Sequence, residues 1–447
     1  MTHPSASGSL AAVGCSPRRR IYIDCTMTSM TSRVTGIQRV VRNVVRHGRA
    51  AGRELGIDCV PVRFAGGRFR VAGPLACLPA AAGVFKIGTA AARRRAQRAG
   101  SRRPIGNCVA ALTPGLCDAS GAVVGAGAPV AWREGDILLL ADSSWEHPLW
   151  FAVAQAQAAG ARVGTVQYDL IPLLHRELVP PGLTAVFSRW MEKALRHTDF
   201  FLTISESVRH QMRAYAATSI AEPARCGDRI VTFPLGSDLG GGRCRRVRAS
   251  VRVPFERRDG GGTYIVVGTI ESRKNQELAI QAFELLWKRS CPASLVLIGR
   301  WGAGTSALVQ HVRGHDRYGE QLFVHENISD GELQWCYRRA RALIFPSKAE
   351  GYGLPIIEAM QHGLPVFASD IAAHCEVGGS HCRFFDPTNP FELAQLVEAF
   401  ESEPGQVRHR VPSTEGLPQW RECVRGLFSL CLDCAEDASR QGLARAA

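Results

Sequence analysis

Short apolar runs alternate with amphipathic stretches along most of the chain. Five such runs lie in its first half, at 21–24, 136–141, 161–166, 200–204 and 230–233. Each is too short for a buried helix and is typical of a buried strand. Apolar residues then recur at helical spacing from about Gly36, and Ser205 stands where the cap of another helix is expected. The pattern predicts parallel strands joined by helices.

A second series of the same kind follows a stretch rich in glycine and arginine at 240–262, which we interpret as a linker. Strands are predicted at 264–267, 294–298, 322–325, 342–345 and 365–368, and helices at 276–288, 330–340 and 354–361. From 419 onward the pattern is that of an amphipathic helix that folds back on the first domain. We therefore expect an α/β protein with two doubly wound domains, and a ligand site in the cleft at the carboxyl ends of their strands.

The expected domain boundaries follow these patterns. Residues 1–20 are small and polar, are predicted to be disordered, and lack the apolar stretch of a secretory signal. The two α/β domains take up 21–240 and 241–410, and the helical tail takes up 411–447. No apolar run approaches the roughly 18 residues that span a bilayer, so we expect a cytoplasmic protein.

The composition agrees with two packed domains and adds an excess of positive charge. Of the 447 residues, 46% are apolar and 21% are charged, which is enough apolar material for two cores. The net charge is +14, and no acidic residue occurs between Cys59 and Cys117. Ten cations fall in that stretch: Arg63, Arg68, Arg70, Lys86, Arg93, Arg94, Arg95, Arg98, Arg102 and Arg103.

Residues 72–130 are interpreted as a basic insertion in the first domain. The segment has a single aromatic residue, Phe85, and no recognition motif, so nucleic acid is not expected as a partner. Contact with an anionic membrane surface or an acidic acceptor fits better, and would place the protein peripherally on the inner face of the membrane. A solvated basic loop without a partner is an equally good interpretation.

The densest group of candidate functional residues follows the predicted strand at 342–345. It reads Glu350-Gly-Tyr-Gly-Leu-Pro-Ile-Ile-Glu358. Glycines let the backbone approach a ligand closely, and N–H groups at the start of a helix bind phosphate oxygens. Two carboxylates at this separation suit hydroxyls at different points along one ligand. Each glutamate alone is more often a helix cap or a solvated charge.

Three further segments lie at the ends of predicted strands or the starts of predicted helices. Arg273 and Lys274 follow a buried strand and precede a helix, which suits a diphosphate, although such a pair alone is usually solvated. Gly36 begins the first helix, where backbone N–H groups are available to a phosphate from the opposite domain. Tyr168 and Asp169 follow the third strand, where catalytic groups commonly project.

Taken together, these segments resemble the retaining GT-B glycosyltransferases of family 4, also called glycosyl transferases group 1. The resemblance covers about 20–55 and 136–410, and its hallmark is the pair Glu350 and Glu358 with seven residues between them. The segment 267–275 is similar to the family's donor-phosphate segment. The resemblance implies the GT-B fold, with two Rossmann-like domains facing across a cleft and a C-terminal helix that returns to the N-terminal domain.

The resemblance also implies roles for the matched residues. Glu350 would contact hydroxyls of the donor sugar, Glu358 would contact the ribose, and Arg273 with Lys274 would neutralise the leaving diphosphate. No metal or other cofactor is expected, and the chain has no Asp-x-Asp. The implied donor site comprises Gly36, Gly268, Arg273, Lys274, Glu350, Gly351, Tyr352, Gly353, Leu354 and Glu358. The implied catalytic residues are Asp169, Tyr168, Glu350, Arg273 and Lys274.

Two positions depart from the family pattern. Many relatives carry arginine where this chain has Thr269, and histidine where it has Tyr168. We expect Arg273 to take over the first role. Tyr168 can donate a hydrogen bond but cannot carry a positive charge, and Asp169 would serve the acceptor hydroxyl or position its loop. His175 replaces the missing histidine if its loop folds inward, and is otherwise a surface residue.

The sequence thus predicts a retaining, metal-independent hexosyltransferase in surface glycan biosynthesis. Its motif variants resemble those of bacterial polysaccharide mannosyltransferases, which makes GDP-mannose the first expected donor. The expected acceptor is a polysaccharide or lipid-linked oligosaccharide of an O-antigen, capsule or exopolysaccharide. Two alternatives stay open: a nucleotide-sugar hydrolase or epimerase on the same fold, and a degenerate, non-catalytic scaffold, which Tyr168 and Thr269 suggest.

Overall fold

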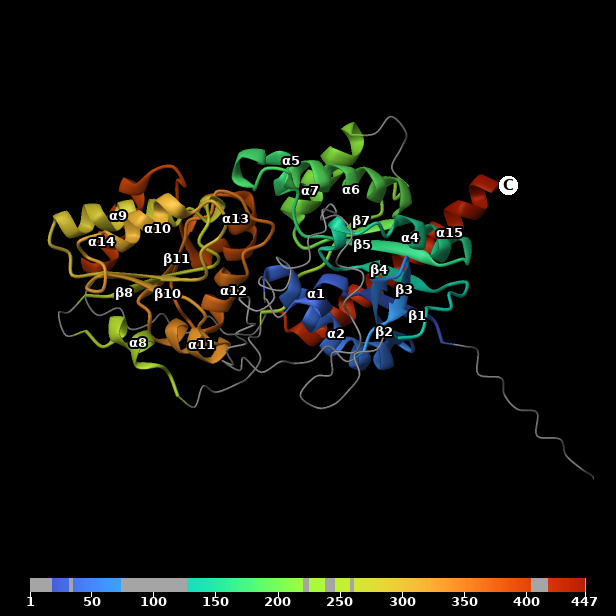
Figure 1. Ribbon diagram of the computed structural model, residues 1–447, viewed down its shortest axis with the longest axis horizontal. Helices are drawn as coiled ribbons and strands as arrows, with labels where there is room; N and C mark the ends of the chain where they lie inside the picture. Colours follow the sequence, from blue (N-terminus) through green and yellow to red (C-terminus); the bar gives the residue numbers. More distant parts are fainter. Residues whose placement is uncertain are drawn as a thin grey trace, which may run out of the picture.

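The protein folds into two α/β domains, each built on its own sheet (Figure 1). The computed structural model describes residues 18–31, 35–73, 127–219, 225–237, 246–257, 261–402 and 417–446. The segment expected to be disordered, up to residue 17, and most of the basic insertion, 74–126, lie outside the described residues. Among the described residues, no helix is long and apolar enough to cross a membrane.

The N-terminal domain has a seven-stranded sheet in the order β3-β2-β1-β4-β5-β6-β7. Its strands are β1 Arg20–Asp24, β2 Asp58–Ala65, β3 Arg68–Val71, β4 Ile137–Leu140, β5 Arg162–Gln167, β6 Phe200–Thr203 and β7 Ile230–Thr232. All neighbours pair in parallel except β2 with β3. The predicted strands of this half are confirmed. Buried apolar runs such as β4 and β6 satisfy their backbone groups by pairing with strands on both sides.

The hairpin of β2 and β3 is an addition to the sequence prediction, and it carries three of the ten cations of the acid-free stretch. Most positions of β2 are only half-buried, although it lies between β3, the edge strand, and β1, so its apolar pattern is weak. Arg63, Arg68 and Arg70 lie on this hairpin and not in the insertion. Backbone bonds from Val71 N to the Ala128 oxygen (3.1 Å) and from Val130 N to the Phe69 oxygen (3.0 Å) anchor the returning end of the insertion.

The helices of the N-terminal domain follow the predicted alternation. They are α1 Thr26–Met30, α2 Gly36–Leu55, α4 Trp150–Ala158, α5 Ile171–Leu174, α6 Leu183–His197 and α7 Glu206–Thr218, with 3₁₀ turns η1 Ser144–Glu146 and η2 Arg176–Leu178. The predicted start of α2 is confirmed, and the helix ends at Gly56 in the left-handed conformation (φ 70°). The predicted cap of α7 is also confirmed, because Ser205 Oγ accepts a hydrogen bond from Val208 N at 3.1 Å.

The C-terminal domain has a six-stranded, fully parallel sheet in the order β10-β9-β8-β11-β12-β13. Its strands are β8 Thr263–Val267, β9 Ser294–Ile298, β10 Leu322–His325, β11 Ala342–Phe345, β12 Val366–Ser369 and β13 Cys382–Phe385. Its helices are α9 Gln276–Lys288, α10 Ser306–Arg313, α11 Asp330–Arg339, α12 Leu354–Gln361, α13 Ala372–Gly378 and α14 Pro390–Ser402, with η4 Ser272–Lys274 and η5 Gly379–His381. The strands and helices predicted here are confirmed, and β13 is an addition.

The stretch interpreted as a linker is part of this domain where it is described. It forms α8 Ala249–Arg252 and η3 Val253–Phe255, and Val251 is buried among the core residues. Arg248 also holds Glu332 of α11 through its Nε at 2.7 Å. The helix was missed because a single buried valine among arginines gives no periodic signal.

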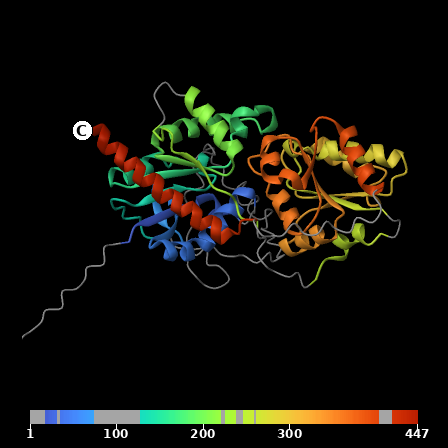
Figure 2. The same ribbon diagram turned by 180° about the vertical axis from the view of Figure 1, so that it is seen from behind.

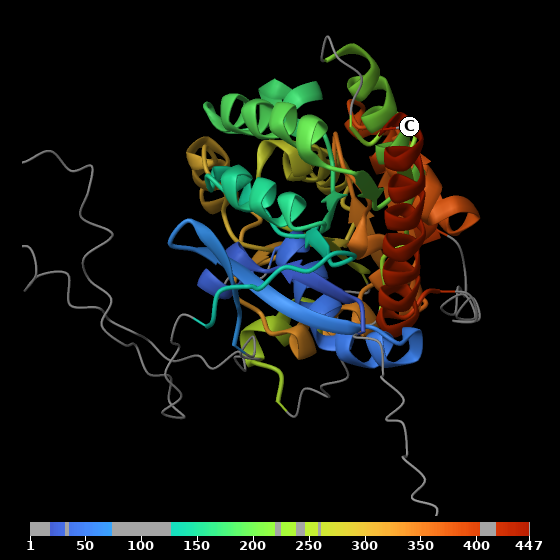
Figure 3. The same ribbon diagram turned by 90° about the vertical axis from the view of Figure 1, so that its right-hand side faces the viewer.

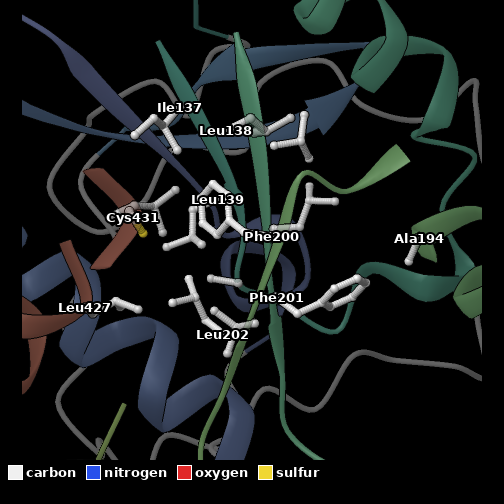
Figure 4. Packing of buried hydrophobic residues seen from close by; sticks show 14 of the residues in the cluster. Ile137, Leu138, Leu139, Ala194, Phe200, Phe201, Leu202, Leu427 and Cys431 are labelled. Atoms are coloured by element: carbon white, nitrogen blue, oxygen red, sulfur yellow. The ribbon is translucent and has the colours of Figure 1, made fainter. Parts of the chain in front are cut away.

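The last helix, α15 Trp420–Ala446, returns to the N-terminal domain, as expected. It runs along one side of that domain beside α2 (Figures 2 and 3). Leu427 and Cys431 point toward the apolar residues of β4 and β6 (Figure 4). A Cβ on Gly48 of α2 would lie 3.4 Å from the ring of Phe428 and 2.4 Å from Cys59 Sγ, so glycine permits this close approach.

Candidate active site

The candidate catalytic residues meet where the two sheets face each other with their carboxyl ends. Glu350 lies in the loop between β11 and α12, and Arg273 and Lys274 form the turn η4 after β8. Asp169 follows β5 in the N-terminal domain. This is the position at which open α/β sheets bind ligands.

Glu350 is held between the two cations that the sequence singles out. Arg273 Nη1 lies 2.9 Å from Glu350 Oε2, and Lys274 Nζ contacts the other oxygen, Oε1. The Glu350 side chain is only 10% exposed. Burial acts to raise its pKa, but Arg273 and Lys274 outweigh burial and hold the pKa well below the usual range. Glu350 is therefore a permanent carboxylate that accepts hydrogen bonds.

The two cations are balanced by acidic groups of the protein. Arg273 donates to the Ala349 oxygen and to Glu271 Oε1, both at 2.9 Å. Burial opposes its charge, yet Glu350 and Glu271 keep its pKa raised. Burial lowers the pKa of Lys274, although Glu350 acts in the opposite direction. A diphosphate entering this site must share both cations with carboxylates, which the sequence does not reveal.

Asp169 approaches this group from the other domain. Its Oδ1 accepts a hydrogen bond from Ile171 N at 3.0 Å, which fixes the loop at the start of α5. Burial raises the pKa of Asp169, and Arg273 across the domain boundary acts to lower it. Asp169 is the carboxylate that faces the C-terminal domain beside Glu350, so the structure brings together the residues that the sequence analysis places apart in the chain.

The Tyr168 side chain is hydrogen-bonded within its own domain. Its hydroxyl donates to the Ala141 oxygen at 2.6 Å, and its ring is buried. The hydrogen bond that this phenol can donate is therefore made within the N-terminal domain. The backbone of Tyr168 also contacts the other domain, because a Cβ on Gly351 would lie 1.9 Å from the Tyr168 carbonyl oxygen. Gly351 is required by this contact between the domains.

Glu358 is fully engaged within the protein. Tyr337 of α11 donates to Glu358 Oε2 at 2.8 Å, and Arg39 of α2 forms an ion pair with Oε1. Glu358 is 2% exposed, and burial raises its pKa although Arg39 acts to lower it. Arg39 lies one turn after Gly36 and reaches across to the C-terminal domain. Sequence analysis missed it, because one arginine on an amphipathic helix gives no signal of a distant partner.

The loop between the two glutamates also joins the domains. Gly353 has a φ of 120°, which favours glycine, and caps α12 without a side-chain hydrogen bond. Tyr352 and Leu354 pack against the cores of both domains. Ser205 Oγ donates to the Gly351 oxygen at 2.7 Å. Within the described residues, no side chain caps the start of α12, but Pro355 has no N–H and Ile356 N donates to the Gly353 oxygen at 2.9 Å.

Three other residues singled out from the sequence are Gly268, Gly36 and His175. Gly268 has a φ of 143°, which favours glycine, and a Cβ there would lie in ordinary contact with the side chain of Lys274. Space beside Gly36 is open, with no atom within 4 Å of a Cβ there. His175 is a surface residue, with its side chain 41% exposed and Nδ1 3.7 Å from Glu177.

Within the described ranges, no group of three or more His, Cys, Asp or Glu residues is placed to hold a metal ion.

A cavity of about 220 Å³ opens beside the catalytic group. Residues of the N-terminal domain, Asp169 among them, form most of its lining, and Glu271 and Arg273 contribute from the C-terminal domain. A ligand in this cavity is adjacent to Glu350, because Arg273 belongs both to the wall and to the ion pair.

Comparison with known proteins agrees with this geometry. Residues 248–413 match the family described as glycosyl transferases group 1. The serotype-specific mannosyltransferase WbdA of Escherichia coli is 31% identical over 313 residues, which are 68% of this chain and 38% of that protein. O-antigen chain mannosyltransferase B of Escherichia coli is 29% identical over 252 residues, which are 53% of this chain and 62% of that protein. The chain thus spans less than two thirds of the length of each relative.

Solved structures share the fold over almost the whole chain. Sucrose-phosphate synthase from Thermosynechococcus elongatus aligns with a TM-score of 0.53 at 16% identity, over 96% of this chain and 98% of that one. HepE of Anabaena in complex with UDP aligns with a TM-score of 0.50 at 12% identity, over 96% and 99%. The chain therefore has the two-domain GT-B fold, contains a glycosyl transferases group 1 domain, and is homologous to the O-antigen mannosyltransferases of Escherichia coli.

Proposed function

We propose that the protein is a retaining hexosyltransferase that moves a sugar from a nucleotide sugar to a hydroxyl of a glycan acceptor. The observation that carries the proposal is the ionised Glu350, held by Arg273 and Lys274 opposite Asp169. The two relatives compared above are named mannosyltransferases. GDP-mannose is therefore the first donor to test, and an O-antigen, capsule or exopolysaccharide chain is the first acceptor.

Donor binding uses the C-terminal domain in this proposal. Glu350 accepts hydrogen bonds from sugar hydroxyls, while the diphosphate lies between Arg273, Lys274 and the backbone N–H groups of the loop 351–354. Glu358 accepts the ribose hydroxyls after Arg39 gives up its contact with Oε1. Fixed cations and backbone dipoles supply the charge stabilisation, so a divalent metal is not part of the proposal.

The reaction needs no nucleophilic side chain. The bond between the anomeric carbon and the diphosphate oxygen breaks as the acceptor oxygen bonds to the same carbon on the same face. The proton of the acceptor hydroxyl passes to the departing diphosphate oxygen. Arg273 and Lys274 stabilise the charge that develops there, and Asp169 orients the acceptor hydroxyl.

The cavity beside Asp169 separates the proposal from its rivals. A nucleotide-sugar hydrolase needs room for a water molecule only, whereas this cavity of about 220 Å³ has room for a larger group. A non-catalytic scaffold gives no reason for a buried carboxylate that is kept ionised in the site. Both rivals predict no transfer to a glycan. We further propose that the protein acts in the cytoplasm, peripherally on the inner membrane face.

A thermal-shift panel of nucleoside diphosphates and nucleotide sugars tests the donor assignment. A ligand that binds the folded protein raises its melting temperature by mass action. We expect GDP and GDP-mannose to raise it more than UDP, ADP or CDP and their sugars. The Glu392→Ala variant, altered on the far helix α14, should respond as the unaltered protein does. A panel in which no nucleotide shifts the melting temperature would contradict the proposal.

A further inference from the structure

Asn275 begins α9 in an unusual way. It lies directly after Arg273 and Lys274, at the position where an asparagine side chain normally accepts a hydrogen bond from the first turn of the helix. Within the described chain, its side chain makes no such bond. Its backbone is in the left-handed conformation, with a φ of 56°, which is unfavourable for any residue other than glycine. The residue is 7% exposed, so a polar amide is also buried here.

The buried amide joins three loops at the carboxyl edge of the sheet. Asn275 Nδ2 donates to the Pro346 oxygen at 3.1 Å and to the Pro387 oxygen at 2.8 Å. Pro346 follows β11, Pro387 follows β13, and Asn275 itself lies between β8 and α9. Both hydrogens of one NH₂ group are therefore engaged with carbonyl groups at the ends of two other strands.

The bond to Pro346 fixes the loop that carries Glu350. Pro346 lies four residues before Glu350, and the chain between them stays against the turn that carries the two cations. Lys348 N donates to the Arg273 oxygen at 2.8 Å, and Arg273 Nη1 donates to the Ala349 oxygen at 2.9 Å. The ion pairs of Glu350 lie at the far end of the same contact. The buried amide thus anchors one end of the contact between the cationic turn and the glutamate loop.

A simpler arrangement is available at the start of α9. A side-chain cap would stabilise the helix by about 1 kcal/mol, and a glycine would fit the positive φ without strain. The chain has neither, which indicates that the amide is needed between the loops. Strain that the surrounding structure holds in place is typical of functional sites. Charged groups that stabilise a leaving group lose much of their effect when they are displaced by about 1 Å.

We propose that Asn275 is a positioning residue for the transfer reaction, and that its side chain sets Arg273 and Lys274 in register with Glu350. The inference rests on the proposed function, which assigns the leaving diphosphate to the two cations. Asn275 itself does not touch the substrate. Its loss should therefore lower the rate of transfer and the affinity for the diphosphate. It should not change the use of the acceptor, whose hydroxyl is oriented by Asp169 of the other domain.

Steady-state kinetics of Asn275→Gly tests this role. Glycine adopts the same φ without cost and removes both amide hydrogen bonds. With GDP-mannose and α-mannotriose we expect kcat to fall about 100-fold, while the KM of the trisaccharide stays within about twofold. GDP should bind about tenfold more weakly, whereas GMP, which lacks the leaving phosphate, should change less than about twofold. Asn275→Asp, which keeps the size of the side chain but presents oxygen atoms to both carbonyl groups, should lower kcat at least as much.

Gln321→Ala is the matched control. Gln321 is 8% exposed, and its Nε2 also donates to two carbonyl oxygens, those of Cys291 at 3.2 Å and Ala293 at 3.4 Å. It lies at the amino end of β10, on the opposite edge of the sheet from the site. We expect this variant to lower the melting temperature, because it loses two buried hydrogen bonds, and to leave kcat and the ratio of GDP to GMP affinity unchanged.

Different outcomes would overturn this inference and the proposed function. Transfer by the unaltered protein together with an unchanged kcat in Asn275→Gly would overturn the inference and leave the proposed function standing. An equal loss of GDP and GMP affinity in Asn275→Gly, or a similar fall of kcat in Gln321→Ala, would also overturn it, because either result reports a general loss of stability. An absence of transfer by the unaltered protein with every nucleotide sugar would contradict the proposed function, and this inference with it. Melting temperatures of all variants identify any that fail to fold.

Discussion

Two glutamates on one loop and helix have opposite electrostatic surroundings. Glu350 lies between Arg273 and Lys274, and its pKa is lowered. Glu358 is deeper, has one cation, Arg39, and its pKa is raised. A carboxylate that stays ionised is suited to accept hydroxyls of the reacting sugar throughout the physiological pH range. Glu358 is held by Tyr337 and by Arg39 of the other domain, so in the proposed function its release to a ribose is coupled to the position of that domain.

Replacement of Glu358 tests the ribose assignment. Glu358→Ala removes both acceptor oxygens, and we expect it to weaken GDP binding by about 1.5–3 kcal/mol, roughly 10- to 150-fold. Isothermal titration calorimetry of GDP measures the change. Glu398→Ala, at an exposed position on α14, serves as the control. An unchanged GDP affinity in Glu358→Ala would remove Glu358 from the donor site.

At this scale, the sequence predicts which residues gather but not which partners they find. Glu350, Arg273 and Asp169 follow strand ends, and parallel strands bring their ends to one edge, so their proximity is predictable. The contacts of Arg39 and Tyr168 depend on how the two domains and the sheet pack. No local pattern encodes them, because each partner lies far away in the sequence.

Helix termini account for much of the local agreement between sequence and structure. Ser205 caps α7 as predicted, and Ser329 begins α11 with a capping box in which Ser329 N donates to Glu332 Oε2 at 2.9 Å. Arg248 adds three further hydrogen bonds to the Glu332 carboxylate, two from its guanidinium at 2.7 and 3.0 Å and one from its backbone N at 3.2 Å. Serine followed three residues later by glutamate indicates the cap in the sequence, whereas nothing there indicates that Arg248 binds Glu332. Its helix, α8, has too few apolar residues to be recognised.

The Glu332 cap predicts a pH-dependent contribution to stability. Burial acts to raise the pKa of Glu332, but Arg248 and Ser329 outweigh it and lower the pKa from 4.5 to about 2. A lowered pKa in the folded state stabilises the fold above the unfolded pKa, and this contribution is lost as the pH falls from about 4.5 toward 2. We expect Glu332→Gln to cost about 1–2 kcal/mol at pH 7 and progressively less toward pH 3.

Urea unfolding at several pH values measures this difference. The exposed Glu398→Gln variant on α14 should differ from the unaltered protein by less than about 0.5 kcal/mol at pH 7. A cost for Glu332→Gln that is constant from pH 7 to pH 3 would show that the carboxylate charge is not what the cap uses.

The packing of the returning helix α15 predicts a loss of stability when its buried phenylalanine is replaced. Phe428 is 0% exposed and packs in the core of the N-terminal domain. Phe428→Ala leaves a cavity, and we expect it to destabilise the protein by about 3–5 kcal/mol. Arg425→Ala, at an exposed position of the same helix, should change stability by about 0.5 kcal/mol or less. Denaturant unfolding that gives similar values for both variants would mean that α15 is not part of this core.

The whole molecule is two domains joined by a small number of specific polar contacts. Glu376 of α13 accepts hydrogen bonds from Glu206 N at 2.7 Å and from Ser207 N at 2.9 Å, at the start of α7. Arg39 and Glu358 form a second link beside the donor site. The two doubly wound domains were predictable from the alternation of strands and helices. Their contacts were not, because they arise only when two finished surfaces meet.

The ion pair between Arg39 and Glu358 predicts that mutations of these two residues have non-additive effects on stability. Arg39→Met leaves Glu358 buried without its cation, and we expect a loss of about 2–3 kcal/mol in stability. Arg39→Met combined with Glu358→Gln should recover part of that loss, because no unpaired charge remains. Arg46→Met, exposed on the same helix, is the control. Additive shifts in the melting temperature for Arg39→Met and Glu358→Gln would contradict a coupled pair.

The cations behind the net charge of +14 lie partly on described strands and partly in the basic insertion. Three of the ten cations in the acid-free stretch lie on the β2–β3 hairpin at the edge of the N-terminal sheet. The others belong to the basic insertion outside the described residues. Docking of that insertion on an anionic surface stays a prediction from composition.

The most direct test of the central claim is turnover of GDP-mannose in the presence of α-mannotriose. We predict GDP release together with a tetrasaccharide whose new linkage has the α configuration of the donor, observed by NMR. Glu350→Gln should lower kcat by about 100-fold or more, because it weakens charge interactions in the site, whereas Glu398→Gln should not. GDP release without a glycosylated product, an inverted linkage, or full activity in Glu350→Gln would contradict the account.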